Sequence, residues 1–233
     1  MIEGILFDLD GTLLDTAPQL IDALNQLLTY YGRPQESPDV LRPLVGEGTR
    51  RILQHAFGID STHPDFHYLR QTYWTIYQMQ ILQTPSQPFP GIVPLLYTLV
   101  ENHIPWGIVT NKPDWLARPL IEALALPQCQ CLIGSETLPE RKPHPLPLLY
   151  GCQSLQTAFQ HTLYIGDTLI DMRAAEAAGL HGAIALFGYA PPLTISAHWP
   201  HAYKIHNPLD LLNIIFKIPN ETRDLMHHVR KMG

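Results

Sequence analysis

Short apolar runs rich in β-branched residues recur along this 233-residue chain and constrain its fold more than any other feature. The strands that they predict are Gly4–Phe7, Trp106–Val109, Cys131–Ile133, Thr162–Ile165 and Gly182–Phe187. Helical patterns of about 10 to 15 residues separate the later runs, which is typical of βαβ units. Continuously apolar strands also indicate a parallel sheet that helices cover on both faces. The sequence therefore predicts an α/β fold with a doubly wound, Rossmann-like parallel sheet.

A long helical stretch interrupts this alternation directly after the first expected strand. From about Ala17 to Gln83, apolar residues keep helical spacing and no convincing strand appears. The proline-rich sequence TPSQPFPG then reads as a stiff return linker. We therefore expect a core formed by residues 1–16 and 86–217, an all-helical insertion over 17–85 and a loosely docked tail over 218–233. The insertion's aromatic residues are expected in its core rather than on a recognition surface: Tyr68, Tyr73, Trp74 and Tyr77.

Composition limits the classes of partner. The net charge is −6 and the 15 Lys and Arg residues form no basic run, which disfavours nucleic acid. No apolar run approaches the roughly 20 residues of a membrane span, and acidic residues break the N-terminal apolar segment. The three cysteines suggest no disulfide framework, and the Cys129/Cys131 pair lacks the further ligands of a zinc site. We expect a soluble cytoplasmic protein whose anionic ligand is small.

Polar residues follow the expected strands at the points where each strand ends. In an open parallel sheet, ligands bind beyond the carboxyl ends of the strands, so these positions are candidates for a common site. In chain order they are Asp8 and Asp10, then Thr110, Asn111 and Lys112, then Ser135 and Glu136, and finally Asp167 and Asp171.

The aspartates carry the strongest chemical signal. Asp8 and Asp10 are separated by one residue, and Gly11 after them allows a sharp turn. An Asx turn would explain one aspartate but not two, and an EF-hand would need a glycine and a closing glutamate that are absent. Asp167 can cap the helix that follows it and also join Asp8 at the rim of the sheet. Converging carboxylates repel unless a hard cation binds them, and oxygen ligands favour magnesium over zinc.

Two further loops offer groups that suit an oxyanion. Thr110 supplies a hydroxyl group, and Asn111 supplies a backbone N–H. Lys142 lies in ERKPHP, where prolines stiffen the loop and can place a positive charge opposite the carboxylates. A solvated surface lysine is the alternative interpretation.

Four motifs together resemble those of the haloacid dehalogenase-like hydrolase superfamily. They are FDLDGTLLDT, VTNK, KPHP and GDTLID, in the order of that family, and the resemblance extends from about Gly4 to Phe187. Helices inserted directly after the first motif resemble the family's first type of cap domain, found in phosphoglycolate phosphatases and β-phosphoglucomutases.

The resemblance implies roles for the aspartates. Asp8 would be the nucleophile that forms an aspartyl phosphate, and Asp10 would protonate the leaving oxygen and then activate water. Mg²⁺ would be held by Asp8, the backbone carbonyl of Asp10, and Asp167. Dehalogenases lack the second aspartate because halide release needs no acid, so Asp10 favours phosphoryl chemistry. We expect Asp8→Asn to abolish activity with little loss of stability, because we place the cluster at the surface.

The same resemblance implies roles for the other loops. Thr110 and Asn111 would bind the transferring oxygens, and Lys142 would neutralise charge on the nucleophile and the phosphoryl group. Asp171 would orient these groups or hold a metal-bound water.

The stretch RPLVGEGTRR indicates how the insertion would select a substrate. Gly46 and Gly48 around Glu47 predict a flexible loop over the active site, similar to the cap loop of phosphoglycolate phosphatases. Gly46, Glu47 and Arg50 are the candidate substrate contacts, and Arg50 or Arg51 can meet a substrate carboxylate unless both face solvent. A dinucleotide-binding loop is disfavoured because no strand precedes it and Arg51 replaces the third glycine.

The passage ENHIPWGIVTNKPDWLARPLIEAL resembles a bacterial branch that dephosphorylates N-acetylmuramic acid 6-phosphate. We therefore predict a Mg²⁺-dependent phosphomonoester hydrolase that acts on a small carboxylate-bearing or sugar phosphate, as phosphoglycolate phosphatases do. Three alternatives stay open: N-acetylmuramic acid 6-phosphate phosphatase, a β-phosphoglucomutase-like phosphotransferase, and a non-catalytic regulator. The sequence does not distinguish a monomer from a homodimer.

Overall fold

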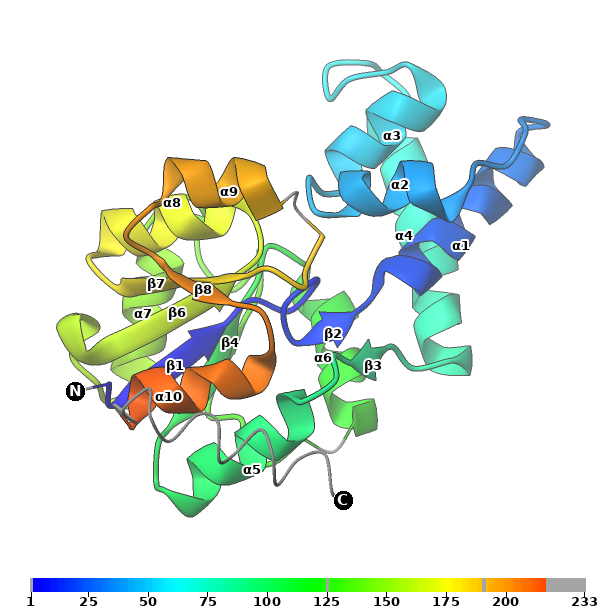
Figure 1. The fold of residues 1–233 in the computed structure, drawn as a ribbon. Coiled ribbons are helices and arrows are strands. Elements are labelled where there is room, and N and C mark those ends of the chain that lie inside the picture. The colour runs from blue at the N-terminus through cyan, green and yellow to red at the C-terminus, as the bar shows by residue number, and fades with distance from the viewer. Residues whose placement is uncertain (1, 125, 190–191, 217–233) are drawn as a thin grey trace.

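A computed structural model of the protein describes residues 2–124, 126–189 and 192–216. The predicted tail, 218–233, lies outside the described residues. Figure 1 shows an α/β part and a separate group of helices beyond the carboxyl ends of its strands. No helix in the described ranges is long and apolar enough to cross a membrane.

A six-stranded sheet forms the centre of the α/β part. Its order is β5-β4-β1-β6-β7-β8, and every neighbouring pair is parallel. The strands are β1 (Gly4–Phe7), β4 (Trp106–Val109), β5 (Leu132–Ile133), β6 (Thr162–Gly166), β7 (His181–Ala185) and β8 (Tyr203–Ile205). The strand order reverses beside β1, which lies between β4 and β6. The predicted doubly wound parallel sheet is confirmed, and β8 at the edge was not predicted.

Helices cover both faces of this sheet. One face packs on α7 (Leu146–Leu155) and α8 (Leu169–Ala178), and Leu6 of β1 points to that side. Ile5 and Phe7 point to the opposite side, where α5 (Ile92–Glu101) packs. This alternation follows from the twofold side-chain period of a strand. The remaining elements are α6 (Asp114–Leu124), α9 (Pro192–His198), α10 (Leu211–Ile215) and the 3₁₀ turns η1 (Phe159–His161) and η2 (Pro208–Asp210).

The inserted helices, which we call the cap, are α1 (Ala17–Tyr30), α2 (Pro38–Val45), α3 (Thr49–Phe57) and α4 (Phe66–Gln83). Two short strands, β2 (Leu14–Asp15) and β3 (Gln87–Pro88), pair antiparallel where the chain enters and leaves the cap. This pairing was not predicted, because two-residue strands leave no periodic signal. Tyr73 and Tyr77 are fully buried in the cap core, as expected, whereas Tyr68 is exposed. The exact domain limits stay a prediction.

Candidate active site

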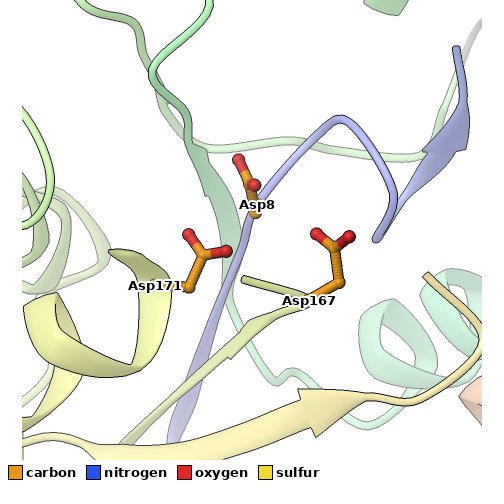
Figure 2. Close-up of side chains that lie close together, drawn as sticks. All are labelled: Asp8, Asp167 and Asp171. Carbon is orange, nitrogen blue, oxygen red and sulfur yellow. The ribbon is translucent and has the colours of Figure 1, made fainter. Parts of the chain in front are cut away.

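Three aspartates converge at the carboxyl ends of the central strands (Figure 2). Asp8 directly follows β1, Asp167 directly follows the neighbouring β6, and Asp171 lies in the first turn of α8. One carboxylate oxygen from each lies within 4.8 Å of the other two. The residues are 7%, 1% and 1% exposed, so this acidic cluster is buried. The expectation of a surface cluster was wrong, because Gly11 and Gly188 pack directly against Asp167 and Lys142 packs against the other two aspartates.

Burial and mutual repulsion oppose full ionisation of the acidic cluster. Burial, with help from the charge of Asp171, raises the pKa of Asp8 to about 7, although Lys142 partly opposes this effect. Burial and the charges of Asp171 and Asp8 likewise raise the pKa of Asp167. Burial acts on Asp171 too, but Lys142 and hydrogen bonds from Thr168 outweigh it and lower its pKa. A buried set of oxygen ligands with unfavourable like charge fits a hard divalent cation.

Lys142 is the cation that the protein itself supplies to this cluster. Its Nζ lies 2.9 Å from Asp8 Oδ1 and 2.7 Å from Asp171 Oδ1, and it donates to the Tyr164 hydroxyl at 2.6 Å. Only 3% of the residue is exposed, so the alternative of a solvated surface lysine was wrong. Burial lowers the pKa of Lys142, but the two carboxylates outweigh burial and raise it. Lys142 therefore remains charged beside Asp8.

The Asp10 carboxylate lies outside the acidic cluster. Its Oδ1 accepts hydrogen bonds from Thr16 Oγ1 at 2.6 Å and from Lys112 Nζ at 2.9 Å. Lys112 is buried, and its Nζ also lies 4.5 Å from the ring centroid of Tyr77 on α4. Both donors contact Oδ1, and no described residue donates a hydrogen bond to Oδ2, so Oδ2 remains available for proton transfer. The metal contact that the resemblance implied for the Asp10 carbonyl stays a prediction.

Thr110 and Asn111 follow β4 and face the same space as Asp8. Thr110 is buried, and its hydroxyl accepts from the backbone N–H of Lys112 at 3.2 Å. Asn111 Nδ2 donates to the carbonyl of Lys142 at 2.8 Å, which joins the two loops. Asn111 Oδ1 is buried and has no hydrogen-bond partner among the described residues.

A cavity of about 490 Å³ connects these loops with the cap, a size that suits a small-molecule ligand. Its core wall includes Asp8, Asp10, Thr110, Asn111, Lys142 and Asp171, and its cap wall includes Gly46, Glu47 and Arg50. Asp167, the remaining member of the acidic cluster, is not part of the lining. Arg51 is also absent from the lining, and it forms an exposed pair with Glu47 at 3.5 Å. The structure thus brings the predicted cap residues to the same cavity as Asp8.

Comparisons with known proteins agree with this geometry. A family model described as haloacid dehalogenase-like hydrolase matches residues 5–185. The chain belongs to this family. A phosphoglycolate phosphatase of Xylella fastidiosa is 40% identical over 79% of this chain and 80% of its own length. An N-acetylmuramic acid 6-phosphate phosphatase of Pseudomonas aeruginosa is 33% identical over 92% of this chain and 95% of its own length.

Solved structures show the same family likeness. A haloacid dehalogenase-like hydrolase of Streptococcus pneumoniae superposes with a TM-score of 0.74 and 26% identity, covering 91% of this chain and 98% of that one. The resemblance that the four motifs indicated is therefore confirmed.

The sequence did not single out Tyr189, which connects the acidic cluster to the cap. Its backbone N–H donates to Asp167 Oδ2 at 2.8 Å. Its hydroxyl accepts from the N–H groups of Thr16 and Ala17 at 2.7 and 2.9 Å, so it caps the start of α1. The same hydroxyl donates to Asp15 Oδ1 at 3.0 Å. No local sequence pattern identifies Tyr189, because the partners of its hydroxyl lie more than 170 residues away in the sequence.

The alternative interpretation of Asp167 as the cap of α8 is not borne out. The N-cap is Thr168, which forms a reciprocal capping box with Asp171. Asp171 Oδ2 accepts from both the Thr168 backbone and its hydroxyl, at 3.0 and 2.6 Å. Both oxygens of Asp171 are therefore hydrogen bonded, which fixes its position beside Lys142.

Proposed function

We propose that this protein is a Mg²⁺-dependent phosphomonoester hydrolase of the phosphoglycolate phosphatase type that works through an aspartyl phosphate on Asp8. The observation that carries the proposal is the placement of Asp8, which lines the cavity, lies in the acidic cluster and contacts Lys142 at 2.9 Å. Its relatives at 40% and 33% identity bear the names of phosphatases, which supports the same class.

The reaction uses two carboxylates in turn. An oxygen of Asp8 attacks phosphorus, the ester P–O bond breaks, and the departing oxygen takes a proton from Asp10. Water then attacks the phosphorus of the aspartyl phosphate and gives a proton back to Asp10, while the bond to Asp8 breaks. Thr16 and Lys112 hold Asp10 by Oδ1, which leaves Oδ2 for both proton transfers.

Neighbouring groups balance the charge of this reaction. Lys142 neutralises charge on Asp8 and on the transferring phosphoryl group, and Thr110 and Asn111 bind its oxygens. Asp8 and Asp167 are the side chains that would hold Mg²⁺, and Asp171, the third carboxylate of the acidic cluster, would orient these groups or hold a metal-bound water. When bound there, the metal would offset the repulsion between phosphate and carboxylate.

A phosphate ester that also carries a carboxylate suits this cavity. Phosphoglycolate is the first candidate because of the relative with 40% identity. N-Acetylmuramic acid 6-phosphate is the second, because a cavity of about 490 Å³ exceeds what a two-carbon acid phosphate fills. The relative named for that substrate also covers 92% of this chain.

The test is phosphate release from p-nitrophenyl phosphate, phosphoglycolate and N-acetylmuramic acid 6-phosphate, with Mg²⁺ and with EDTA. We expect turnover that needs Mg²⁺ and that falls by about 1,000-fold or more in Asp8→Asn. Asp22→Asn is the matched control, because Asp22 is an exposed aspartate on α1.

Three results would contradict the proposal. Substantial turnover in Asp8→Asn would show that another group is the nucleophile. Conversion of glucose 1-phosphate to glucose 6-phosphate without phosphate release would instead favour the phosphotransferase alternative, and no turnover with any ester would favour the regulator.

A further inference from the structure

The cavity contains more positive charge than its own carboxylates neutralise. Its lining includes five cationic side chains: Arg50, Arg70, Lys112, Arg141 and Lys142. The two lysines are paired with aspartates at 2.9 Å or less. The three arginines have no carboxylate at ion-pair distance within the described parts of the chain. A ligand with an anionic group besides its phosphate would therefore meet positive charge in this cavity.

Arg70 is the arginine that the structure holds in place. Its guanidinium carbon lies 4.8 Å from the ring centroid of Trp74, one helical turn further along α4, and 5.8 Å from that of Phe66. One nitrogen lies 3.3 Å from His67 Nδ1, which leaves most of its five N–H donors free. Stacking uses the face of the guanidinium group, so its edge remains able to bind a carboxylate through two hydrogen bonds. Arg50 and Arg141 are exposed and stack on no ring in the described residues.

Trp74 itself contacts both the cap and the core. Its indole N–H donates to Thr49 Oγ1 at 3.2 Å, directly after the Gly46–Gly48 loop. Its ring packs edge to face against Trp115 of the core helix α6, with 5.9 Å between centroids. The position of the Arg70 guanidinium therefore depends on how the cap sits against the core.

We propose that Arg70, held against Trp74, is the residue that selects substrates by binding a carboxylate while the phosphoryl group lies at Asp8. The proposal rests on the phosphatase function given above and adds the group that recognises the second anion. A half-buried, stacked guanidinium loses less side-chain freedom on binding than an exposed one, which favours Arg70 over Arg50.

Two esters that differ only at the second group give the sharpest test. Phosphoglycolate carries a carboxylate where 2-hydroxyethyl phosphate carries a neutral CH₂OH group. Their dissociation constants are measured by calorimetry with Mg²⁺ on the Asp8→Asn protein, where turnover does not interfere. We expect the Asp8→Asn protein, the parent of the variants below, to bind phosphoglycolate more tightly than 2-hydroxyethyl phosphate. Adding Arg70→Gln to this parent should weaken phosphoglycolate binding by about 10- to 100-fold. We expect 2-hydroxyethyl phosphate binding to change much less.

Three further variants distinguish carboxylate binding by Arg70 from a general disturbance of the cavity. Arg70→Lys keeps the charge but loses the planar donors, so we expect an intermediate preference. Trp74→Leu keeps Arg70 but removes the ring beneath it, so the preference for the carboxylate should also fall. Arg51→Gln, on an exposed arginine outside the cavity lining, should leave the preference unchanged.

The proposal is overturned if the parent does not distinguish the two esters, or if Arg70→Gln weakens both equally or neither. The phosphatase function is judged separately, by phosphate release from the protein that retains Asp8. A retained binding preference without any release would contradict the phosphatase function and leave the role of Arg70 intact.

Discussion

Replacing Asp8 by asparagine should stabilise the protein when no divalent cation is bound. The substitution preserves shape but removes one charge from the acidic cluster, where only 7% of Asp8 is exposed. Burial, together with Asp171, raises the pKa of Asp8 from 3.8 to about 7, and this value already includes the opposing attraction of Lys142. Ionised Asp8 therefore destabilises the native state, and asparagine removes that effect.

The size of this effect follows from the pKa difference. The two values differ by about 3, and a difference of one corresponds to about 1.4 kcal/mol, which gives about 4 kcal/mol when Asp8 is fully ionised. Because the folded pKa is the higher one, the destabilisation is absent below about pH 4, grows as the pH rises and is complete above about pH 7. Asparagine does not titrate. We therefore expect Asp8→Asn to exceed the wild type by about 4 kcal/mol at pH 8 and by about 1 kcal/mol at pH 4.5.

Urea denaturation in EDTA at these two pH values measures the free energy of unfolding. Asp22→Asn serves as the control, since the exposed Asp22 lies outside the cluster. Mg²⁺ should narrow the gap at pH 8, because it stabilises the wild-type cluster more than the variant. The reasoning is refuted if Asp8→Asn is no more stable than the wild type at pH 8, or if the gap does not depend on pH.

Two further substitutions test the contacts around the site by the same unfolding assay. Lys142→Met should destabilise the protein by about 3 to 5 kcal/mol, because it leaves two buried carboxylates without their cation. The control is Lys204→Met, on an exposed lysine. A loss of stability below about 1 kcal/mol in Lys142→Met, similar to that of the control, would contradict this prediction. Tyr189→Phe should cost about 2 kcal/mol, because two N–H groups at the start of α1 lose their acceptor. The exposed Tyr203→Phe should change little, and equal stabilities for the two tyrosine variants would count against the capping role.

The central strands and the motif positions could be predicted because their signals are local. Gly4–Phe7 and Trp106–Val109 form strands with the predicted limits, since short apolar runs of this kind become fully buried strands. The meeting of Asp8 and Asp167 followed from the rule that ligands gather at the carboxyl ends of parallel strands. Both inferences need only the fold class and the sequence next to each strand.

The contacts that tune the site could not be predicted, because they depend on how distant segments pack. Lys112 donates a hydrogen bond to Asp10, which lies 102 positions earlier in the sequence. Tyr77 of the cap packs against the Lys112 ammonium group and helps to bury it. The helical spacing of Arg70 and Trp74 indicates that they share a helix face. That face points toward the cavity because α4 packs against α6, which the sequence does not indicate. The edge strand β8 is a different case, since its three residues carry too little pattern to identify it.

Side-chain contacts around Tyr189 join the core to the cap, in addition to the two connecting segments of the chain. Tyr189 holds Asp167 through its backbone N–H and holds the first turn of α1 through its hydroxyl. Arg42 of α2 lies 2.9 Å from Asp15 and 5.1 Å from the ring centroid of Tyr189, so a second cap helix rests on the same side chain. A tilt of α1 would separate these groups and would also disturb the hydrogen bond to Asp167. The geometry that relates the acidic cluster to the cap wall is therefore set by packing around Tyr189 rather than by the length of the connecting strands.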